Sequence, residues 1–441
     1  MEAQALKKRA KLAMDRNKVK IAGFGSTLIS TPELGFKEMK SSAYVREQLQ
    51  DLDLEMQEGF AITGIRALLK GSSHHANICL LSELDAVMSP ENPMASPDGA
   101  AHACGHSTQS TQLYAAAIAL SEVQDDLEGD VTFLAVPAEE FLDLEYRLQL
   151  RQEGKISYLS GKQEMIKLDI FAGIDMVIMI HAQPNTPAYK VFVGGGSLGF
   201  TAKNIRFLGK EAHGASPFTG INALQAAHLA IAGINANRET FSEEERIRIH
   251  PILTKGGDVV NTVPSDVRME TYIRGSHRAA IERGCTVVDR CAEAGAAMMG
   301  GHVVIETIAG YLPLNQDPLL GEAFAQEAQQ VLGEDCIVRG VDMVGSTDMG
   351  DLSHLMPCIQ PTMGGFAGDA HAKDFKVCDP LRSYLLGGEI LANLVIELLK
   401  DGCALAKTIR TSFVPLMDRD AYLRYLETEK ENMHVGKGKA Q

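Results

Sequence analysis

Closely spaced cysteine pairs are missing from this sequence. Its eight cysteines are scattered singly, without a Cys-x-x-Cys motif or the spacing of a disulfide framework. This distribution argues against a disulfide-stabilised secreted fold and favours a reducing compartment. The basic, amphipathic N-terminus, residues 1–20, also lacks the apolar core of a secretion signal, so we predict a surface helix there. Together these absences predict a cytoplasmic protein.

Charged side chains are absent from one long stretch. Between Ala212 and Asn237 there is no Lys, Arg, Asp or Glu, but histidine, asparagine and glutamine side chains make a membrane span a poor interpretation. We expect a loop followed by a buried helix. Over the whole chain the formal net charge is −15, which argues against binding to nucleic acid or to an anionic membrane. We therefore predict neither as a partner.

The length of 441 residues and the hydrophobic content of 45% predict a folded protein of two or three domains. The first 190 residues alternate apolar, strand-like runs with helical patterns, which is typical of an α/β sheet flanked by helices. We expect strands in residues 76–87, 130–140 and 174–184, and helices in residues 41–52 and 110–123. Polar residues follow these strands, at the edge where open α/β sheets bind ligands.

A glycine cluster at residues 193–200 marks a change in the pattern of predicted strands and helices. From there the pattern predicts a strand, a helix, two strands, a helix and a strand, which is the order of a ferredoxin-like α+β domain. No internal repeat or low-complexity segment stands out. We therefore predict a main α/β domain in two parts, residues 1–192 and 313–441, the second ending in a helical tail, with an inserted domain at residues 193–312.

Potential metal ligands recur after the predicted strands. In the segment AAHACGH, residues 100–106, the side chains of His102, Cys104 and His106 are spaced to share one side of an extended chain. Carboxylate and imidazole groups also occur at other strand ends or in later loops. They are Glu83, Asp85, Glu139, Glu140, His181 and His371. Any one of these alone is usually structural, but their recurrence predicts a divalent metal site.

The donor types indicate a chemistry without fixing the metal. A thiolate is a strong, soft ligand for zinc, and imidazoles suit Zn, Mn, Ni or Co, so mixed sulfur, nitrogen and oxygen ligation is compatible with several ions. Of two adjacent carboxylates, one can ligate a metal while the other takes a proton from a bound water. The pair Glu139 and Glu140 therefore favours metal-assisted hydrolysis.

The order of motifs along most of the chain resembles the co-catalytic metallopeptidase and aminoacylase superfamily. The similarity is strongest to its N-acyl-amino-acid amidohydrolases, which include indoleacetyl-amino-acid, hippurate and aminobenzoyl-glutamate hydrolases. The motifs are STPELGFKE (30–38), ITGIRALLKG (62–71), HACGH (102–106), PAEE (137–140), MIHAQP (179–184), GKEAHGASPFTGINAL (209–224), GGDVVNTVPSDVRMETYIRG (256–275) and His371. The segment GSTDMGDLSH (345–354) is most similar to the aminobenzoyl-glutamate and dipeptidase-like branch.

The resemblance implies a zinc-peptidase-like catalytic domain with two divalent ions, for which we expect Mn or Zn first and Co or Ni as alternatives. It implies that Glu139 is the general base and that Asp85, and less directly Glu83, orient the ligands. The residues that it implies as metal ligands, with Cys104 bridging the two ions, are Cys104, His106, Glu140, His181 and His371.

The inserted domain resembles the lid and dimerisation domain of these enzymes. The resemblance implies that His213 reaches the partner subunit's site and stabilises an oxyanion, so we predict a homodimer. It also implies that Asn261 and Arg274 bind the substrate's carboxylate. From the residues alone, Asn261 could equally cap a turn and Arg274 could be a surface strand residue.

Ser107 departs from the family pattern, in which HACGH is followed by Asp or Asn. This substitution bears on metal affinity, metal choice and substrate range. The leading hypothesis is hydrolysis of an N-acyl amino acid, with a dipeptidase or carboxypeptidase of the same superfamily as the nearest alternative. Two further alternatives are a thiol enzyme with Cys104 as nucleophile and a catalytically weak metal-binding paralogue.

Overall fold

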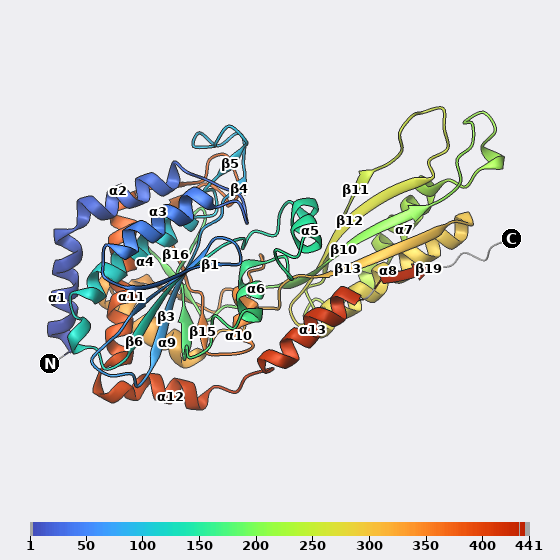
Figure 1. Cartoon of the computed structure of the whole chain (residues 1–441). Coiled ribbons are helices and arrows are strands. Elements are labelled where there is room, and N and C mark those ends of the chain that lie inside the picture. The colour runs from blue at the N-terminus through green and yellow to red at the C-terminus, as the bar shows by residue number, and fades with distance from the viewer. Residues whose placement is uncertain (1–2, 432, 437–441) are drawn as a thin grey trace. The chain divides into compact units, whose positions relative to one another are not determined.

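The computed structural model describes residues 3–431 and 433–436, and the chain divides into two compact units (Figure 1). The first unit comprises residues 1–196, 315–342 and 351–416, and the second comprises residues 197–314, 343–350 and 417–441. The sequence pattern predicts that all of residues 313–441 belong to the main domain. The C-terminal residues instead belong to the second unit, because helix α13 (Arg419–Glu431) contacts its sheet and strand β19 (Met433–Gly436) pairs with it.

The first unit is built on a six-stranded mixed sheet in the order β1-β2-β6-β3-β7-β15. Strands β3, β6, β7 and β15 run parallel, whereas β1 and β2 are antiparallel additions at one edge. The strands are β1 (Glu55–Phe60), β2 (Gly64–Leu69), β3 (Asn77–Glu83), β6 (Asp130–Val136), β7 (Met176–Ile178) and β15 (Cys358–Ile359). Strands β3 and β6 are buried at almost every position, as expected for parallel strands covered on both faces.

Smaller sheets complete the first unit. A four-stranded sheet has the order β14-β9-β16-β8, and two pairs join β4 with β5 and β17 with β18. Their bounds are β4 (Val87–Met88), β5 (Ala100–Ala101), β8 (His181–Ala182), β9 (Val191–Val193), β14 (Ile337–Arg339), β16 (Thr362–Met363), β17 (Phe366–Ala367) and β18 (Lys376–Val377). Several of these short strands lie in the segments that follow strands of the main sheet along the chain.

Apolar helices form the core beside the main sheet. Helix α4 (His106–Ser121) is almost fully buried and packs against α11 (Pro380–Leu399), where Gly388 allows close approach because a Cβ there would lie 2.6 Å from the Ala115 side chain. The other helices of this unit are α1 (Ala3–Arg16), α2 (Lys18–Ile29), α3 (Met39–Gln50), α5 (Leu144–Gln152), α6 (Gly161–Lys167), α9 (Pro318–Leu332), α10 (Met349–Ser353, which begins in residues assigned to the second unit) and α12 (Ala404–Ser412).

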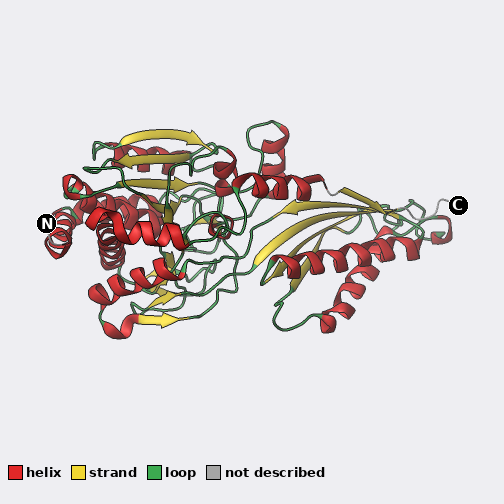
Figure 2. Cartoon of the chain, turned by 90° about the horizontal axis from the view of Figure 1, so that it is seen from below, coloured by secondary structure: helices red, strands yellow, loops and turns green. Residues whose placement is uncertain are grey.

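The second unit has the predicted ferredoxin-like arrangement. Its antiparallel sheet has the order β11-β12-β10-β13-β19, and helices α7 and α8 pack on it and on each other (Figure 2). The elements are β10 (Gly199–Leu208), α7 (Ala223–Asn237), β11 (Arg248–Lys255), β12 (Asp266–Gly275), α8 (Arg278–Met299) and β13 (His302–Ala309). Strand β19 is an addition at the β13 edge that the sequence did not predict.

The uncharged stretch forms a loop and then the helix α7, as predicted. One side of α7, with Ala226, Ala230 and Ile234, lies in the core of the second unit, and Gly295 of α8 fits closely against the α7 backbone. The apolar face of this helix is therefore covered within the chain. Among the described residues, no helix combines the length and the hydropathy needed to cross a membrane.

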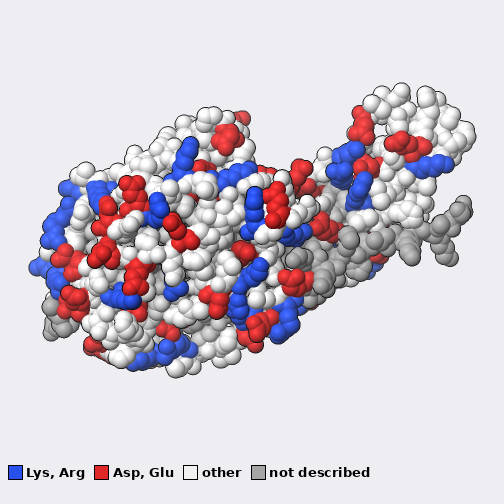
Figure 3. Space-filling view, in the orientation of Figure 1, with Lys and Arg blue, Asp and Glu red and all other residues white. Residues whose placement is uncertain are grey.

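Charged side chains of both signs are mixed on the surface. Among the residues drawn in colour in Figure 3, Lys and Arg alternate with Asp and Glu over the visible face of the first unit. That face therefore presents no continuous surface of one sign.

Candidate metal centre

Cys104 and His106 lie where the chain turns from an extended segment into helix α4. Gly105 precedes the helix with φ of 93°, and a Cβ at this position would lie 2.5 Å from the side chain of Ala182. Only glycine satisfies both demands, and the resulting close approach brings the turn against strand β8. The HACGH turn and the MIHAQP segment, far apart in the sequence, meet for this reason.

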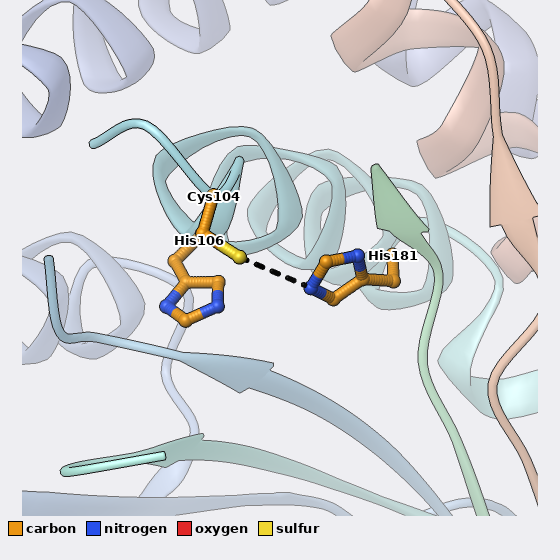
Figure 4. Close-up of side chains that lie close together, drawn as sticks. All are labelled: Cys104, His106 and His181. Atoms are coloured by element: carbon orange, nitrogen blue, oxygen red, sulfur yellow. Dashed lines mark hydrogen bonds between the residues drawn. The ribbon is translucent and has the colours of Figure 1, made fainter. Parts of the chain in front are cut away.

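Three side chains converge at this junction (Figure 4). Cys104 Sγ lies 3.6 Å from His181 Nε2. His181 Nδ1 is 2.9 Å from the backbone carbonyl oxygen of Ala182, and His106 Nδ1 is 2.8 Å from the backbone carbonyl oxygen of Asp85. Because a carbonyl only accepts hydrogen bonds, each Nδ1 donates its proton, and in the neutral ring each Nε2 carries the lone pair that a metal ligand needs.

A second group shares the same cysteine. The ligand atoms of Cys104, Glu140 and His371 lie within 4.8 Å of one another, as do those of Cys104, His106 and His181. Glu140 Oε1 is 3.1 Å from His371 Nε2. The His371 loop is tied to the HACGH segment by a backbone hydrogen bond from His371 to Ala103. The structure thus brings together all five predicted ligands, in two triads that meet at Cys104.

These residues suit a divalent ion chemically. They offer one sulfur, three imidazole nitrogens and a carboxylate, a donor set typical of zinc and other late first-row metals. Within the described part of the chain, His106 Nε2 is completely buried yet makes no hydrogen bond, although Glu83 Oε2 lies 3.1 Å away. A buried nitrogen without a hydrogen bond is costly unless a ligand meets it.

His102 does not join the cluster. The sequence spacing predicts that its side chain shares one side of an extended segment with Cys104 and His106, but the extended segment ends where helix α4 begins at His106. Among the described residues, His102 belongs to none of the three groups with metal-ligand spacing. Burial lowers the pKa of His102 to about 3, so its imidazole is neutral.

The adjacent carboxylates of the PAEE segment are both buried, but they differ in their partners. Glu139 Oε2 is 3.9 Å from His106 Nε2, whereas Glu140 faces His371. Asp85 Oδ2 accepts a hydrogen bond of 2.8 Å from the Glu140 backbone N–H, and Asp85 Oδ1 lies 3.2 Å from His106 Nδ1. Asp85 therefore holds both the helix start and the PAEE segment in place.

Electrostatics favour an ionised Glu140 and a neutral Cys104 thiol in the absence of a metal. Burial opposes ionisation of Glu140, but the hydrogen bond and the charge of His371 lower its pKa to about 2. The same hydrogen bond raises the pKa of His371. Burial, reinforced by the Glu140 charge, raises the pKa of Cys104 well above its ordinary value. A thiol that is hard to ionise is a poor nucleophile on its own, which argues against the thiol-enzyme alternative.

Four residues that the sequence analysis gave no role support this centre. Arg147 of α5, 1% exposed, donates hydrogen bonds to the carbonyls of Ala138 and Glu140. Glu38 accepts hydrogen bonds from the Ala138 backbone N–H and from the Thr63 hydroxyl. Lys162 of α6 and Gln109 of α4 both bind Glu83. Helices rich in charged residues usually face solvent, so no periodicity marks Arg147 or Lys162 in advance.

In the second unit, His213 and Asn261 lie on neighbouring exposed loops. Gly214 donates a backbone hydrogen bond of 2.6 Å to the Asn261 carbonyl, and His213 pairs with Thr262 in an isolated bridge. His213 Nδ1 accepts a hydrogen bond of 3.0 Å from the Ala215 backbone N–H, so in the neutral ring the proton is on Nε2. This ring presents a hydrogen-bond donor outward.

Arg274 is held on strand β12 by three neighbours. Its guanidinium lies 5.3 Å from the Phe200 ring centre and 5.9 Å from that of Tyr272, and it donates a hydrogen bond to the Ser346 hydroxyl. Stacking on aromatic rings fixes the plane of a guanidinium while leaving its other N–H groups available. Arg274 is half-buried, which differs from an ordinary surface strand residue.

Comparison with known proteins places the chain in a family. Residues 79–397 match the profile of peptidase family M20/M25/M40. The Xaa-Arg dipeptidase of Mus musculus is 25% identical over 380 residues, which cover 82% of this chain and 80% of that protein. The N-acetylcysteine deacetylase of Bacillus subtilis is 25% identical over 311 residues, which cover 68% of this chain and 77% of that protein.

Solved structures show the same fold. A putative aminohydrolase from methicillin-resistant Staphylococcus aureus superposes with a TM-score of 0.74 and 21% identity, covering 89% of this chain and all of that one. A dinuclear metal binding peptidase of the M20 family from Bacillus subtilis superposes with a TM-score of 0.68 and 21% identity, covering 88% and 99%. The chain belongs to peptidase family M20/M25/M40, and it is a metal-dependent hydrolase of that family that acts on amide bonds.

Proposed function

We propose that this protein is an amidohydrolase that uses two divalent ions to cleave N-acyl amino acids. The observation that carries the proposal is the pair of triads that share Cys104. A shared thiolate places two ion positions side by side, as in two-metal hydrolytic sites. The family membership and the dinuclear metal binding peptidase among the structural neighbours support the same interpretation.

The two positions have different ligands. Cys104, His106 and His181 would hold one ion, and Cys104, Glu140 and His371 the other. When bound, the ions supply Lewis acidity that polarises the amide carbonyl and makes a water more acidic. Sulfur, nitrogen and oxygen donors together are compatible with Mn or Zn and also with Co or Ni.

Glu139 is the general base of this proposal. It is buried beside His106 and lies in neither triad that contains Cys104, so the proposal assigns it no part in holding the two ions. It would take the proton from the attacking water and later give it to the leaving nitrogen. An intact Glu139 also argues against a catalytically idle paralogue.

The second unit would contribute recognition. The outward Nε2–H of His213 suits a developing oxyanion, and we expect it to act in the partner subunit's site of a homodimer. The stacked guanidinium of Arg274 and the amide of Asn261 suit a free carboxylate. An N-acyl amino acid and a dipeptide share that carboxylate, which agrees with a deacetylase and a dipeptidase both occurring among the relatives.

A paired substrate panel tests this function. The protein, loaded with Mn or Zn, is offered N-acetyl amino acids, dipeptides and the C-terminal amides of both. We expect release of free amine from the acids, strong loss of rate with the amides, and abolition by a chelator. Faster cleavage of dipeptides than of N-acyl amino acids would favour the dipeptidase alternative. Equal rates on acids and amides would contradict the assigned carboxylate recognition.

A further inference from the structure

Ala138, the residue before the two adjacent glutamates, has a left-handed backbone. Its φ is 54°, in a region that few residues other than glycine adopt because the Cβ crowds the backbone there. The carboxylates that follow have different neighbours, since Glu139 Oε2 lies 3.9 Å from His106 Nε2. Glu140 Oε1 lies 3.1 Å from His371 Nε2 instead. The conformation of Ala138 therefore sets the direction in which both side chains leave the chain.

The two peptide groups that flank Ala138 are held by two different side chains. Glu38 Oε1 accepts a hydrogen bond of 2.8 Å from the Ala138 backbone N–H, and Arg147 Nη1 donates one of 3.3 Å to the Ala138 carbonyl. Because a peptide group is planar, the first bond fixes the plane before this residue and the second fixes the plane after it. Arg147 Nη2 also donates a hydrogen bond to the Glu140 carbonyl. One guanidinium thus binds the backbone on both sides of Glu139.

Arg147 is a buried cation without an acidic partner. It is 1% exposed, and among the described residues its guanidinium pairs with no carboxylate. Its further neighbours are the Leu159 carbonyl, to which Nη1 donates a hydrogen bond of 2.5 Å, and two aromatic rings. The ring centres of Phe36 and Phe141 lie 5.3 and 5.8 Å from the guanidinium carbon. Burial of a charge without an ionic partner is costly, so this arginine points to a role in orienting the backbone that it binds.

The fold of this segment does not depend on Arg147 alone. The Ala138 carbonyl also accepts a long hydrogen bond of 3.4 Å from the Gly161 backbone N–H, and the Glu140 carbonyl accepts one of 2.8 Å from that of Leu142. Loss of Arg147 would therefore leave neither carbonyl without a donor. It would, however, leave the peptide plane after Ala138 with the long bond from Gly161, so that this alanine could relax towards a negative φ.

We propose that Arg147 is a positioning residue for the reaction, which holds Ala138 in the left-handed conformation and so directs the Glu139 carboxylate at the attacking water. This inference rests on the proposed function, in which Glu139 is the general base. Arg147 is assigned no contact with the substrate or the ions and acts through the backbone. A misplacement of about 1 Å can cost about 10²-fold in rate, so the expected effect is measurable.

Steady-state kinetics of Arg147→Met, at saturating Mn or Zn and with an N-acetyl amino acid as substrate, tests the inference. Methionine is also a long, flexible side chain but has no donor, so kcat should fall by about 10- to 100-fold. KM should stay within about twofold, because the proposed contacts with the substrate carboxylate lie in the second unit. The matched control is Lys7→Met, which removes another buried cation, paired with Glu327 at 2.8 Å, and should leave kcat unchanged.

Two further variants separate positioning from packing. Ala138→Gly removes the Cβ that disfavours a positive φ. In the background of Arg147→Met, Ala138→Gly should restore part of kcat, since glycine adopts the left-handed conformation without help from a guanidinium. Arg147→Lys keeps the charge but replaces the planar fork with a single ammonium group, so its kcat should lie between those of the wild type and Arg147→Met.

The outcomes separate this inference from the proposed function. An active wild type with an unchanged kcat in Arg147→Met would overturn the inference and leave the two-ion hydrolase intact. Failure of Arg147→Met to fold, or an equal loss of kcat in Lys7→Met, would show a general structural effect and would also overturn it. The same holds if Ala138→Gly restores no activity to Arg147→Met. A wild type without metal-dependent hydrolysis of N-acyl amino acids or dipeptides would overturn both proposals.

Discussion

The two units differ in how deeply they bury most of their candidate functional residues. In the first unit, Cys104, His106 and Glu140 are each less than 10% exposed, and Asp85 makes hydrogen bonds with His106 and Glu140, whereas His371 is exposed. In the second unit, His213 and Asn261 lie on exposed loops. Under the proposed function, the difference predicts a rigid, preorganised reactive centre and recognition by groups that meet water or a partner. Rigid first-unit residues should control metal binding and proton transfer, and second-unit residues should control oxyanion stabilisation and substrate choice.

The largest expected effect is that of Glu139→Gln. This change removes the proposed base and keeps the size of the side chain, so kcat should fall by about 10²- to 10⁴-fold. Metal content should stay at the wild-type value, because Glu139 belongs to neither triad that shares Cys104. Steady-state kinetics and elemental analysis of the same sample check both parts. A variant that loses metal together with activity would make Glu139 a ligand rather than a base.

The next effect is that of His213→Ala. Loss of one oxyanion donor should lower kcat by about 10²- to 10³-fold without changing metal content. Because we expect His213 to act in the partner's site, coexpression of His213→Ala with Glu139→Gln should produce mixed dimers with one complete site. The isolated mixed dimer should regain part of the wild-type rate. A mixed dimer as inactive as its parents would place His213 in its own chain's site, or outside catalysis.

Arg274→Gln should sharpen the distinction between chemistry and recognition. Removal of a charge-assisted contact with the substrate carboxylate should lower kcat/KM by about 10- to 100-fold for substrates with a free carboxylate. The C-terminal amides should be cleaved at nearly the wild-type rate. The ratio of kcat/KM for the acid and its amide is the quantity to measure. An equal loss on both substrates would assign Arg274 a structural role beside Ser346.

The last expected effect concerns stability and leaves the rate aside. Burial, and then the nearby Asp85 charge, raise the pKa of Glu38 from 4.5 to about 8. Between these values the folded chain binds a proton that the unfolded chain has lost, so this group makes stability fall as pH rises from about 4.5 to 8. Glu38→Gln should remove that loss, which is of the order of a few kcal/mol. Denaturant unfolding of the wild type and of Glu38→Gln at pH 5 and pH 8 measures this effect. If the free energy of unfolding fell equally in both proteins between the two pH values, the prediction would be wrong.

Sequence patterns located the centre because its ligands follow buried strands. The recurrence of such residues after strands and the family resemblance predicted a metal site formed by Cys104, His106, Glu140, His181 and His371, and the structure brings these five residues together. The ferredoxin-like order of the second unit also followed from alternating periodicities. Such patterns show which side of a helix or strand is apolar. They are enough to locate a site whose ligands lie at the ends of buried strands.

The supporting groups could not be predicted in the same way. Lys162 reaches Glu83 across 79 residues of sequence, and its short helix gives no sign that a lysine is buried. Strand β19 pairs with β13 more than 120 residues earlier, in a segment whose composition is that of a polar tail. Both depend on long-range contacts whose partners the sequence order does not reveal, so they become visible only in the folded chain.

The central claim is that two ions share Cys104, and metal content per chain tests it most directly. The wild type and Cys104→Ala are each purified without chelator, or reconstituted with Mn, Zn, Co or Ni. Elemental analysis then gives the number of metal ions per chain in both proteins. We expect about two ions per chain for the wild type, as in two-metal sites, and loss of both in Cys104→Ala, since both triads contain this thiol. No metal above background under any condition, or two ions retained without Cys104, would contradict the account.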